Sequence, residues 1–450
     1  MSAYAEYQKI NLPWLKAIPA HWEVRRNKNI FTEQKEIVGE KSSDYTLLSL
    51  TLSGIVPRDM DGGGKFPESF DKYKIVRNGD MAFCLFDIDE TPRTVGLSGH
   101  DGMLTGAYTI MHVSNINSRF IYYYYLALDN GKMLKPLYSG LRKTININTF
   151  QSTKVPVPPR EEQDQIVRFL DWKVSSINKL INIKKKEIKA IDALKRSTVS
   201  HAITRGLTAD APMKYSGVKW LGDIPQRWYT VPLYAIAQVK SINNCIDLPL
   251  MSVYLDAGVV PFVEREEKRT NATSKDLTNY QRVDPGDFVL NNQQAWRGSV
   301  GVSFHSGIVS PAYIVLSLNN TLDSHYANYL FRSRCMVDQY LVISRGVGSI
   351  QRNLYWSALK RVVVPIPSKK EQMEIVEYLD GLNNKFDATI KKLTEEVAVL
   401  EEYKNKIIAD TVTGKIDVRG IEIPEYEFVD EDADADNEDD GEEDTEEQED

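Results

Sequence analysis

An internal repeat constrains this chain more than any other feature of its sequence. The motif Trp-Leu-x-x-Ile-Pro-x-x-Trp at residues 14–22 returns at residues 220–228. A second motif, Val-Pro-Val/Ile-Pro followed by Glu-Gln-x-x-Ile-Val, occupies residues 155–167 and returns at residues 364–376. The two copies lie about 206 to 209 residues apart, and the halves differ heavily between these anchors. A frame that repeats while its contents vary predicts a scaffold that carries two different recognition modules.

The length of 450 residues predicts more than one domain, because each half is long enough to bury its own core. A hydrophobic content of 42% is typical of a soluble globular protein. No apolar run approaches the roughly 18 residues that a membrane helix needs, and the N-terminus lacks a secretory pattern. The three cysteines, Cys84, Cys245 and Cys335, are too few and too scattered for a disulfide framework. We therefore expect a cytoplasmic protein without membrane contact.

The net charge of -8 hides an asymmetry along the chain. Residues 422–450 contain 18 acidic residues and no Lys or Arg, which leaves 45 acidic against 55 basic residues, a net charge of +10, over residues 1–421. A basic body is compatible with nucleic-acid binding. The tail, residues 417–450, is expected to be disordered. It either keeps the protein in solution or mimics DNA and competes for the basic body.

Each half begins with a mixed segment, residues 1–158 and 218–367, in which short β-rich runs alternate with turns. The expected strands are residues 46–50, 80–86, 108–113, 250–255, 287–290 and 313–318. Helices are expected at residues 119–128 and, in the corresponding place of the second half, at 323–331. The predicted fold class is α+β, with two pseudo-repeated mixed α/β domains.

Two long helices are predicted after the mixed segments, at residues 159–206 and 368–416, with residues 207–217 as a linker. A Pro-Pro pair followed by acidic residues starts the first helix, and a capping-box pattern from Ser368 to Glu371 starts the second. Apolar residues spaced by 3 and 4 form a narrow stripe on each helix: Leu170, Val174, Ile177, Ile181, Ile188 and Ile191, then Leu379, Phe386, Ile390, Leu393, Val397, Leu400 and Ile407. Such a stripe requires a partner helix.

The two helices satisfy this requirement most simply by pairing with each other as a coiled coil. Each helix is about 60–67 Å long at 1.5 Å per residue. The alternative is that each helix packs separately on its own domain. That alternative is weaker, because a helix of this length overhangs a domain of about 160 residues.

No catalytic motif is found in the sequence. There is no phosphate-binding Gly-x-x-x-x-Gly-Lys-Ser/Thr loop, no strand–glycine loop–helix pattern around residues 62–64, and no Asn-Pro-Pro-Tyr-like tetrapeptide of amino-methyltransferases. The six histidines and three cysteines show no metal-ligand spacing. Asp87, Asp89 and Glu90 form an acidic cluster, which we interpret as a solvated loop rather than a metal site.

Candidate DNA contacts lie in the turn-rich parts where the two halves differ. The amide side chains at residues 291–294 suit adenine edges, and the arginine that follows suits guanine. A glycine-rich loop at residues 344–352 can bring backbone close to phosphates. The predicted DNA-binding residues are Lys65, Lys72, Lys74, Arg93, Arg142, Lys143, Arg265, Lys268, Arg269, Lys275, Gln293, Gln294, Arg297, Arg345, Gln351 and Arg352.

The paired motifs and the long helices together resemble the specificity subunit of type I restriction–modification systems. The resemblance covers residues 10–417, and the acidic tail lies outside it. It implies two target-recognition domains separated by two antiparallel helices, each domain reading one half of a split double-stranded DNA site. It also implies that the chain is not an enzyme. Two modification subunits, with restriction or translocase subunits in some assemblies, then supply the methylation and cleavage, and S-adenosylmethionine, ATP and magnesium bind to those partners.

Two other functions are compatible with parts of the sequence. A non-catalytic coiled-coil adaptor that binds proteins explains the helices but leaves the basic body without a purpose. A fused methyltransferase is disfavoured by the missing motifs. A steep salt dependence of DNA binding distinguishes the DNA-reading protein from the adaptor.

Overall fold

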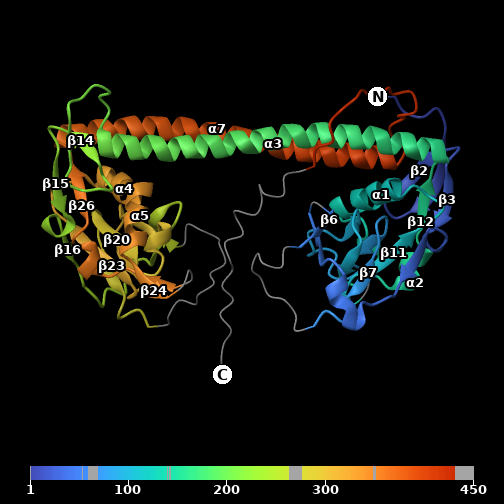
Figure 1. The fold of residues 1–450 in the computed structure, drawn as a ribbon, viewed down its shortest axis with the longest axis horizontal. Helices are drawn as coiled ribbons and strands as arrows, with labels where there is room; N and C mark the ends of the chain where they lie inside the picture. The colour runs from blue at the N-terminus through green and yellow to red at the C-terminus, as the bar shows by residue number, and fades with distance from the viewer. Residues whose placement is uncertain are drawn as a thin grey trace. The chain divides into compact units, whose positions relative to one another are not determined.

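The computed structural model describes residues 2–52, 54–58, 69–138, 140, 143–262, 276–347 and 351–430, without the side chains of Val347 and Gln351. The chain divides into two compact units (Figure 1). Within the described residues, unit 1 contains 2–186 and 393–430, and unit 2 contains 187–392. Each unit therefore takes in one part of each long helix.

Unit 1 is built from short antiparallel strands and two helices besides the long ones. Its strands are β1 (Tyr7–Leu12), β2 (Leu15–Pro19), β3 (Glu23–Arg26), β4 (Phe31–Gln34), β5 (Leu48–Thr51), β6 (Gly54–Pro57), β7 (Lys74–Val76), β8 (Met81–Phe83), β9 (Val95–Leu97), β10 (Gly102–Leu104), β11 (Thr109–Val113) and β12 (Lys154–Val157). Its own helices are α1 (Ser118–Asn130) and α2 (Ile147–Ser152), with short 3-10 turns at Asn27–Asn29, Gly39–Asp44 and Lys135–Leu137.

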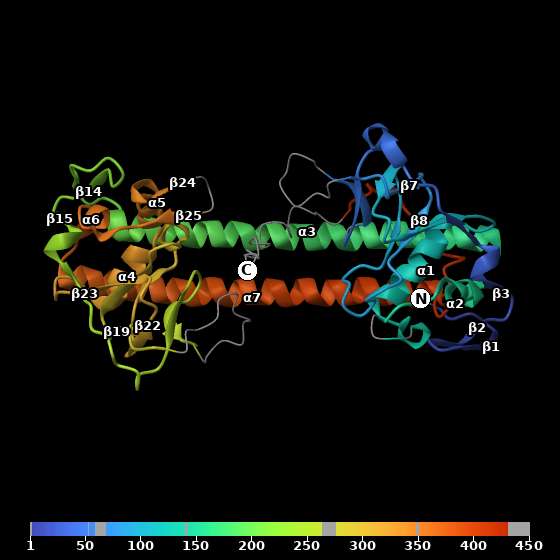
Figure 2. The ribbon, with the colours of Figure 1, turned by 90° about the horizontal axis from the view of Figure 1, so that it is seen from below.

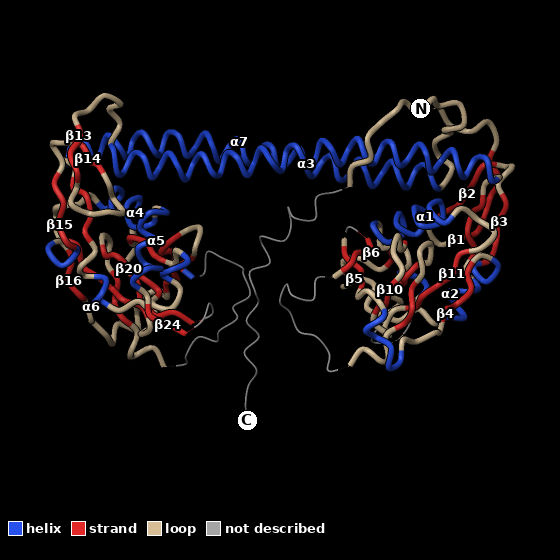
Figure 3. The backbone as a smooth tube through the Cα atoms, in the orientation of Figure 1, coloured by secondary structure: helices blue, strands red, loops and turns tan. Residues whose placement is uncertain are grey.

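Unit 2 has the same kinds of elements in nearly the same order (Figure 3). Its strands are β13 (Met213–Tyr215), β14 (Asp223–Pro225), β15 (Tyr229–Pro232), β16 (Ala237–Val239), β17 (Met251–Tyr254), β18 (Gly258–Pro261), β19 (Gln281–Val283), β20 (Asp287–Asn291), β21 (Val300–Val302), β22 (Gly307–Val309), β23 (Tyr313–Leu318), β24 (Arg345–Val347), β25 (Gln351–Asn353) and β26 (Val363–Ile366). Its helices are α4 (Ser324–Arg332), α5 (Arg334–Ile343) and α6 (Trp356–Leu359), with 3-10 turns η4 (Leu233–Ala235) and η6 (Ala295–Arg297).

The sequence repeat is a repeat of topology. The four-stranded sheet of unit 1 has the order β4-β11-β8-β9, and that of unit 2 has the order β16-β23-β20-β21. The two-stranded pairs correspond as well: β1-β2 to β13-β14, β3-β12 to β15-β26, β5-β6 to β17-β18, and β7-β10 to β19-β22. The hairpin β24-β25 and helix α5 have no counterpart among the described elements of unit 1. The two units thus share a frame and differ in what is added to it.

The strands and helices predicted from local pattern are confirmed. Residues 313–318 form β23 with the predicted bounds, and the predicted strand at 80–86 shortens to β8. The aromatic-rich run at 119–128 forms α1, whose side chains join the sheet and α3 in one core. In this core Phe83 from the sheet, Tyr125 from α1 and Phe169 from α3 are all buried. Helix α1 therefore fixes the sheet of unit 1 to the long helices.

The long helices are α3 (Arg160–Arg205) and α7 (Lys369–Val412). They lie side by side and antiparallel in unit 1, where Lys184 pairs with Glu396 and Lys404 Nζ donates to Asn178 Oδ1 at 3.3 Å. They also lie side by side in unit 2 (Figure 2), where Lys195 Nζ lies 2.5 Å from Asp387 Oδ1. Lys184 and Lys195 on α3 and Lys404 on α7 therefore each contact a residue of the other long helix.

None of the predicted stripe residues is exposed, although their burial is uneven. Leu170, Ile177 and Ile181 on α3 are buried, whereas Ile188 and Ile191 further along are half-buried. On α7, Phe386 and Ile390 are half-buried as well. Two helices alone leave part of such a stripe accessible. No helix among the described residues is both long enough and apolar enough to cross a membrane.

Candidate nucleic-acid interface

The Glu-Gln pair of the repeated motif joins each domain to its long helix. In unit 1, the buried Glu162 at the start of α3 accepts a hydrogen bond from Trp22 Nε1 at 2.9 Å. In unit 2, Glu371 on α7 accepts one from Trp228 Nε1 at 3.0 Å. Both indole rings are almost fully buried. In each unit, the same indole–carboxylate contact thus joins the two repeated sequence motifs.

The glutamine that follows in the motif contacts the start of a second helix in each unit, α1 in unit 1 and α4 in unit 2. Gln163 Oε1 accepts from the backbone N–H of Asn117 at 2.8 Å, and Gln372 Oε1 accepts from that of Asp323 at 2.7 Å. Asn117 caps α1 and Asp323 caps α4 with their side chains, which satisfies free N–H groups of the first turn. The amide of each glutamine donates to the last proline of the Val-Pro-Val/Ile-Pro motif. Sequence reasoning recognised this motif but not the contact it makes.

The carboxylates of the two motifs have different neighbours. Glu162 also accepts from Tyr4 Oη at 2.5 Å and lies 2.7 Å from His21 Nε2. Burial and the contact with Glu162 raise the pKa of Tyr4 far above its usual range. Glu371 instead pairs with Arg227. Burial alone raises the pKa of Glu371, but the hydrogen bonds from Arg227 and Trp228 outweigh it and bring this pKa below 4.5.

The capping box predicted for α7 forms only in part. The Glu371 backbone N–H lies 3.3 Å from Ser368 Oγ, as a capping box requires. The Glu371 carboxylate, however, receives the Ser368 hydroxyl, the Trp228 indole and the Arg227 guanidinium. Tertiary contacts have therefore taken over the side chain that the local pattern assigns to the cap.

Of the four described residues of unit 1 that were predicted to bind DNA, three are engaged within the protein. Lys72 is exposed. Lys74 Nζ donates to the Tyr108 carbonyl at 2.6 Å, and burial lowers its pKa. Lys143 Nζ contacts Glu90 at 3.0 Å and Asp89 at 3.4 Å. Of the described candidates in this unit, Lys72 is therefore the one whose position fits a DNA contact best.

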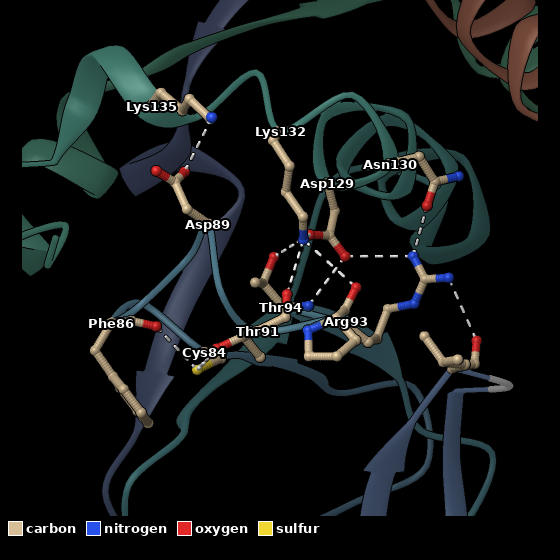
Figure 4. A network of polar contacts seen from close by, with 12 residues as sticks. Cys84, Phe86, Asp89, Thr91, Arg93, Thr94, Asp129, Asn130, Lys132 and Lys135 are labelled. Atoms are coloured by element: carbon tan, nitrogen blue, oxygen red, sulfur yellow. Dashed lines mark hydrogen bonds and ion pairs between the residues drawn. The ribbon is translucent and has the colours of Figure 1, made fainter. Parts of the chain in front are cut away.

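Arg93 belongs to a network around a buried carboxylate (Figure 4). Asp129 on α1 is 1% exposed and accepts from Arg93 at 3.3 Å, from Lys132 at 2.8 Å and from the Thr94 hydroxyl at 2.6 Å. Arg93 also donates to Asn130 Oδ1 at 2.7 Å. A buried carboxylate needs such partners, because an unpaired buried charge is very costly. The structure thus gives Arg93 a role in holding α1 against the neighbouring loop.

In the acidic cluster of unit 1, Asp89 and Glu90 lie beside lysine side chains. Asp89 lies 3.6 Å from Lys135 Nζ and accepts from Tyr138 Oη at 3.0 Å. Glu90 pairs with Lys143. Among the described residues, no group of three or more His, Cys, Asp or Glu side chains is arranged to hold a metal ion.

Unit 2 brings several of its predicted DNA-binding residues together around Trp296. The guanidinium of Arg297 lies 4.8 Å from the centre of the Trp296 ring, and that of Arg352 lies 5.9 Å from it. Trp296 Nε1 donates to the Gln293 carbonyl at 2.8 Å, which fixes the ring over its own loop. We call Gln293, Gln294, Trp296, Arg297 and Arg352 the tryptophan–arginine cluster. Arg297 and Gln293 in it are exposed.

Two backbone features position this cluster. The hairpin β24-β25 pairs Gly346 with Arg352 and Arg345 with Asn353, so that both arginines lie on one ribbon. The Leu354 N–H then donates to the Asn292 carbonyl at 2.9 Å, which ties the hairpin to the loop of Trp296. Gly298 ends the η6 turn at φ +110°, a conformation that side chains with a Cβ rarely adopt. Sequence reasoning selected the arginines but missed the tryptophan between them, although its position in the Gln-Gln-Ala-Trp-Arg run was a usable signal.

A shallow depression of about 660 Å³ lies elsewhere on unit 2. It is lined by two aromatic rings, two cations and an amide, together with small apolar groups: Tyr234, Gln238, Trp356, Lys360, Arg361, Ala237 and Val239. Flat rings beside positive charges are suited to nucleic-acid surfaces. Sequence reasoning did not select these residues, because they come from two segments more than a hundred residues apart.

Six of the predicted DNA-binding residues lie outside the described residues: Lys65, Arg142, Arg265, Lys268, Arg269 and Lys275. A seventh, Gln351, is described without its side chain. Arg345 is exposed at the start of β24.

The family model, the relatives and the solved structure that match this chain all belong to type I restriction–modification systems. The family model for the type I restriction modification DNA specificity domain matches residues 103–191 and 225–399. The MjaVIII type I restriction enzyme specificity subunit of Methanocaldococcus jannaschii is 24% identical over 428 residues, which covers 90% of this chain and 95% of that protein. The putative MjaX specificity subunit of the same organism is 25% identical, and the match covers 89% of this chain and 95% of that protein. A structure from a study of the assembly and conformational transition of the type I R-M system matches with a TM-score of 0.59 at 14% identity, covering 89% of this chain and 99% of that one.

Proposed function

This chain belongs to the type I restriction–modification DNA specificity family, and we propose that its two domains read the two unlike halves of a split DNA site. The chain is a specificity subunit with DNA specificity domains. The bipartite, asymmetric site and the division of reading between the units are the proposal. It follows from two recognition modules that share a frame and carry different surfaces.

The observation that carries the proposal is the tryptophan–arginine cluster of unit 2. The two Glu-Gln anchors and the two four-stranded sheets correspond, yet the described part of unit 1 has no counterpart of the β24-β25 hairpin that carries Arg352. Arginine forms paired hydrogen bonds to guanine, and glutamine forms them to adenine. Trp296 restricts Arg297 and Arg352, so less side-chain freedom is lost on binding. Two such different surfaces are suited to two different half-sites.

We assign the long helices to partner binding and to the spacing of the half-sites. The stripe residues that are half-buried, such as Ile188 and Phe386, leave apolar surface on the helix pair accessible. Apolar surface of this kind is suited to helices of another protein. The proposed partners are two modification subunits, with a restriction or translocase subunit as a further member of the assembly.

In this proposal the chain binds and positions and does not catalyse. Methyl transfer to adenine takes place in the modification subunits, which bind S-adenosylmethionine, and ATP and magnesium serve the restriction subunits. The proposed DNA-binding residues of this chain contact the two half-sites and take no part in methyl transfer or cleavage. Purified chain without partners is therefore expected to show neither methyl transfer nor nuclease activity.

The decisive experiment maps methylated adenines in cells that express the modification subunits with and without this chain. The expected result is a two-part motif with a fixed gap that appears only when the chain is present. Absence of any chain-dependent motif contradicts the proposed function.

A second arm tests the spacing role of the helices. Seven residues are inserted into both helices together, after Lys186 in α3 and after Lys392 in α7. At 1.5 Å per residue this adds about 10 Å, which corresponds to about three base pairs of unread DNA. Insertion into α3 alone is the matched control, because it breaks the register of the pair. A gap that stays the same after the double insertion excludes the spacing role but not the reading role.

A further inference from the structure

The chain that follows α7 returns along α3 as an extended segment, which we call the strap, residues 418–430 (Figure 1). The expected disorder of residues 417–450 is therefore wrong for this part, because its backbone is bound by side chains of α3. Gln165 Nε2 on α3 donates to the carbonyls of Val418 at 3.0 Å and Ile421 at 2.8 Å. Ser175 Oγ donates to the Glu427 carbonyl at 3.0 Å and accepts from the Val429 N–H at 2.8 Å. These contacts all lie within unit 1.

The end of the strap is held in the same way. Asn178 Nδ2 donates to the Val429 carbonyl at 3.2 Å, and Asn182 Nδ2 donates to the Asp430 carbonyl at 3.0 Å. Positions 175, 178 and 182 are spaced by 3 and 4, so they share one face of α3. The strap is therefore bound through its backbone by a row of polar side chains on a single helix face.

The strap covers this face of α3. Ser175 is 1% exposed, and Asn178 and Asn182 are each 6% exposed. The first part of the strap also packs through its side chains, because Val418 is buried in the core of unit 1 and Ile421 and Ile423 pack against that core. After Pro424 the side chains contribute less, since Glu425 and Glu427 are exposed and Phe428 is 52% exposed beside Arg119. Residues 425–430 of the strap are bound mainly through their backbone and have mostly exposed side chains, so this part can detach without opening the hydrophobic core.

In the second copy of the repeat, no strap covers the same helix face among the described residues. The α7 residues that correspond to Gln165, Ser175, Asn178 and Asn182, at the spacing of 209, are Glu374, Asn384, Asp387 and Lys391. All four are exposed. Two of the amide donors are replaced by carboxylates, which cannot donate a hydrogen bond to a carbonyl when ionised. The α7 face thus lacks two of the four side-chain donors that hold the strap on α3.

The uncovered α7 face also carries side chains typical of protein interfaces. Tyr378 lies one helical turn after Glu374 and is 45% exposed, whereas its counterpart Phe169 on α3 is fully buried in the core of unit 1. Met373 beside it is 64% exposed. Tyrosine and methionine are enriched at protein–protein interfaces. We define the open face by Met373, Glu374, Tyr378, Asn384, Asp387 and Lys391.

We propose that the strap covers the α3 copy of a docking face for modification subunits and leaves the α7 copy open, so that two identical subunits bind this chain with unequal affinity. The first subunit binds at the open face of α7. The second binds at α3 after the strap has detached. This inference rests on the proposed function, because it takes the modification subunit as the occupant, and identical partners on a repeated frame use equivalent faces.

The test is a titration of full-length chain with purified modification subunit, followed by native mass spectrometry, which resolves one-subunit and two-subunit complexes. A chain that ends after Gly420 lacks most of the strap and the acidic tail. A chain that ends after Asp430 keeps the strap and lacks the tail, so it is the matched control. We expect the shorter chain to bind the second subunit about tenfold more tightly than full-length protein, with the first step unchanged.

A pair of point variants tests the same inference in the full-length chain. Asn178→Asp places a carboxylate where the strap needs a donor, as in the α7 copy, and is expected to detach the strap and strengthen the second step. Asn243→Asp, which makes the same change at an exposed asparagine outside α3, α7 and the strap, is the matched control. Hydrogen exchange at the Val429 amide, which bonds to Ser175, reports the detachment directly and independently of the partner.

The outcomes separate the two proposals. A second step that is unchanged or weakened in the chain ending after Gly420 overturns the role of the strap and leaves the proposed function intact. The same holds if the chain ending after Asp430 shows the full gain, since the acidic tail then accounts for it. No binding of the modification subunit to any of these chains refutes the proposed function itself.

Discussion

Units 1 and 2 share an anchoring contact and differ in its surroundings. In both, a buried tryptophan donates to the glutamate that begins the long helix, through Trp22 and Glu162 or Trp228 and Glu371. The third partner is His21 in unit 1 and Arg227 in unit 2. The frame therefore depends on the indole–carboxylate pair, and the neighbouring basic side chain can change without a change of fold.

The arginines of the two units differ more. Arg93 in unit 1 is 16% exposed at its side chain and pairs with a buried aspartate, whereas Arg297 in unit 2 is exposed over a tryptophan. Both were predicted as DNA contacts from their sequence surroundings. The comparison shows that a positive charge in a loop is a potential contact only after its intramolecular partners are known.

The largest effect is expected at the anchoring contact. Trp228→Ala removes a fully buried ring and leaves Glu371 without one donor, so unit 2 is expected to lose about 3–5 kcal/mol of stability. Trp22→Ala is expected to do the same to unit 1. Hydrogen exchange resolved by unit measures both, and the half-buried Trp296→Ala is the control with a much smaller loss. If one of these substitutions lowers the stability of both units equally, the two tryptophan–glutamate contacts do not anchor the units independently.

Arg93→Ala tests whether this residue is structural. It removes a charged hydrogen-bond partner of Asp129, so unit 1 is expected to lose about 1.5–3 kcal/mol of stability. The sequence preference of the assembled enzyme is expected to stay the same. Denaturation and methylation mapping are the two measurements, with the exposed Lys72→Ala as the control for stability. A change of half-site preference without a loss of stability assigns Arg93 to DNA reading instead.

Arg297→Ala tests the reading role of unit 2. Discrimination at one position of one half-site is expected to fall by about 1–3 kcal/mol, because a paired contact to a base edge is lost. The other half-site is expected to be unaffected. Methylated-adenine mapping measures this, and Arg334→Ala, an exposed arginine that pairs with Asp338 on α5, is the control. Alteration of both half-sites by Arg297→Ala argues against separate reading.

The smallest expected effect is the dependence of unit 2 stability on pH through the carboxylate of Glu371. The pKa of Glu371 is lowered in the folded protein, so its ionised form stabilises unit 2 above the ordinary value of 4.5. This contribution is lost as the pH falls through the lower, folded-state pKa. Glu371→Gln is therefore expected to flatten the dependence of unit 2 stability on pH below 4.5. Acid titration monitored by hydrogen exchange checks it, and an unchanged slope removes Glu371 from the account.

Much of the fold could be predicted from local patterns. The strand at residues 313–318 and the helix at 119–128 are in place, and the long helices begin within one residue of the predicted positions. These elements depend on periodicity and on start signals, which are local. The candidate interface was less accessible to prediction, because it depends on pairings such as Trp296 with Arg352, across 56 positions of the sequence.

The sequence by itself determined that the protein has a repeated frame, two different modules and two long amphipathic helices, since motif spacing and apolar periodicity are properties of the chain alone. Tertiary structure decided which charges remain available: Arg93 pairs with Asp129, Arg297 stays exposed, and Asn178 binds the strap. The physical reason is that a side chain's partner lies far away in sequence, and burial determines whether the side chain contacts the protein or the solvent.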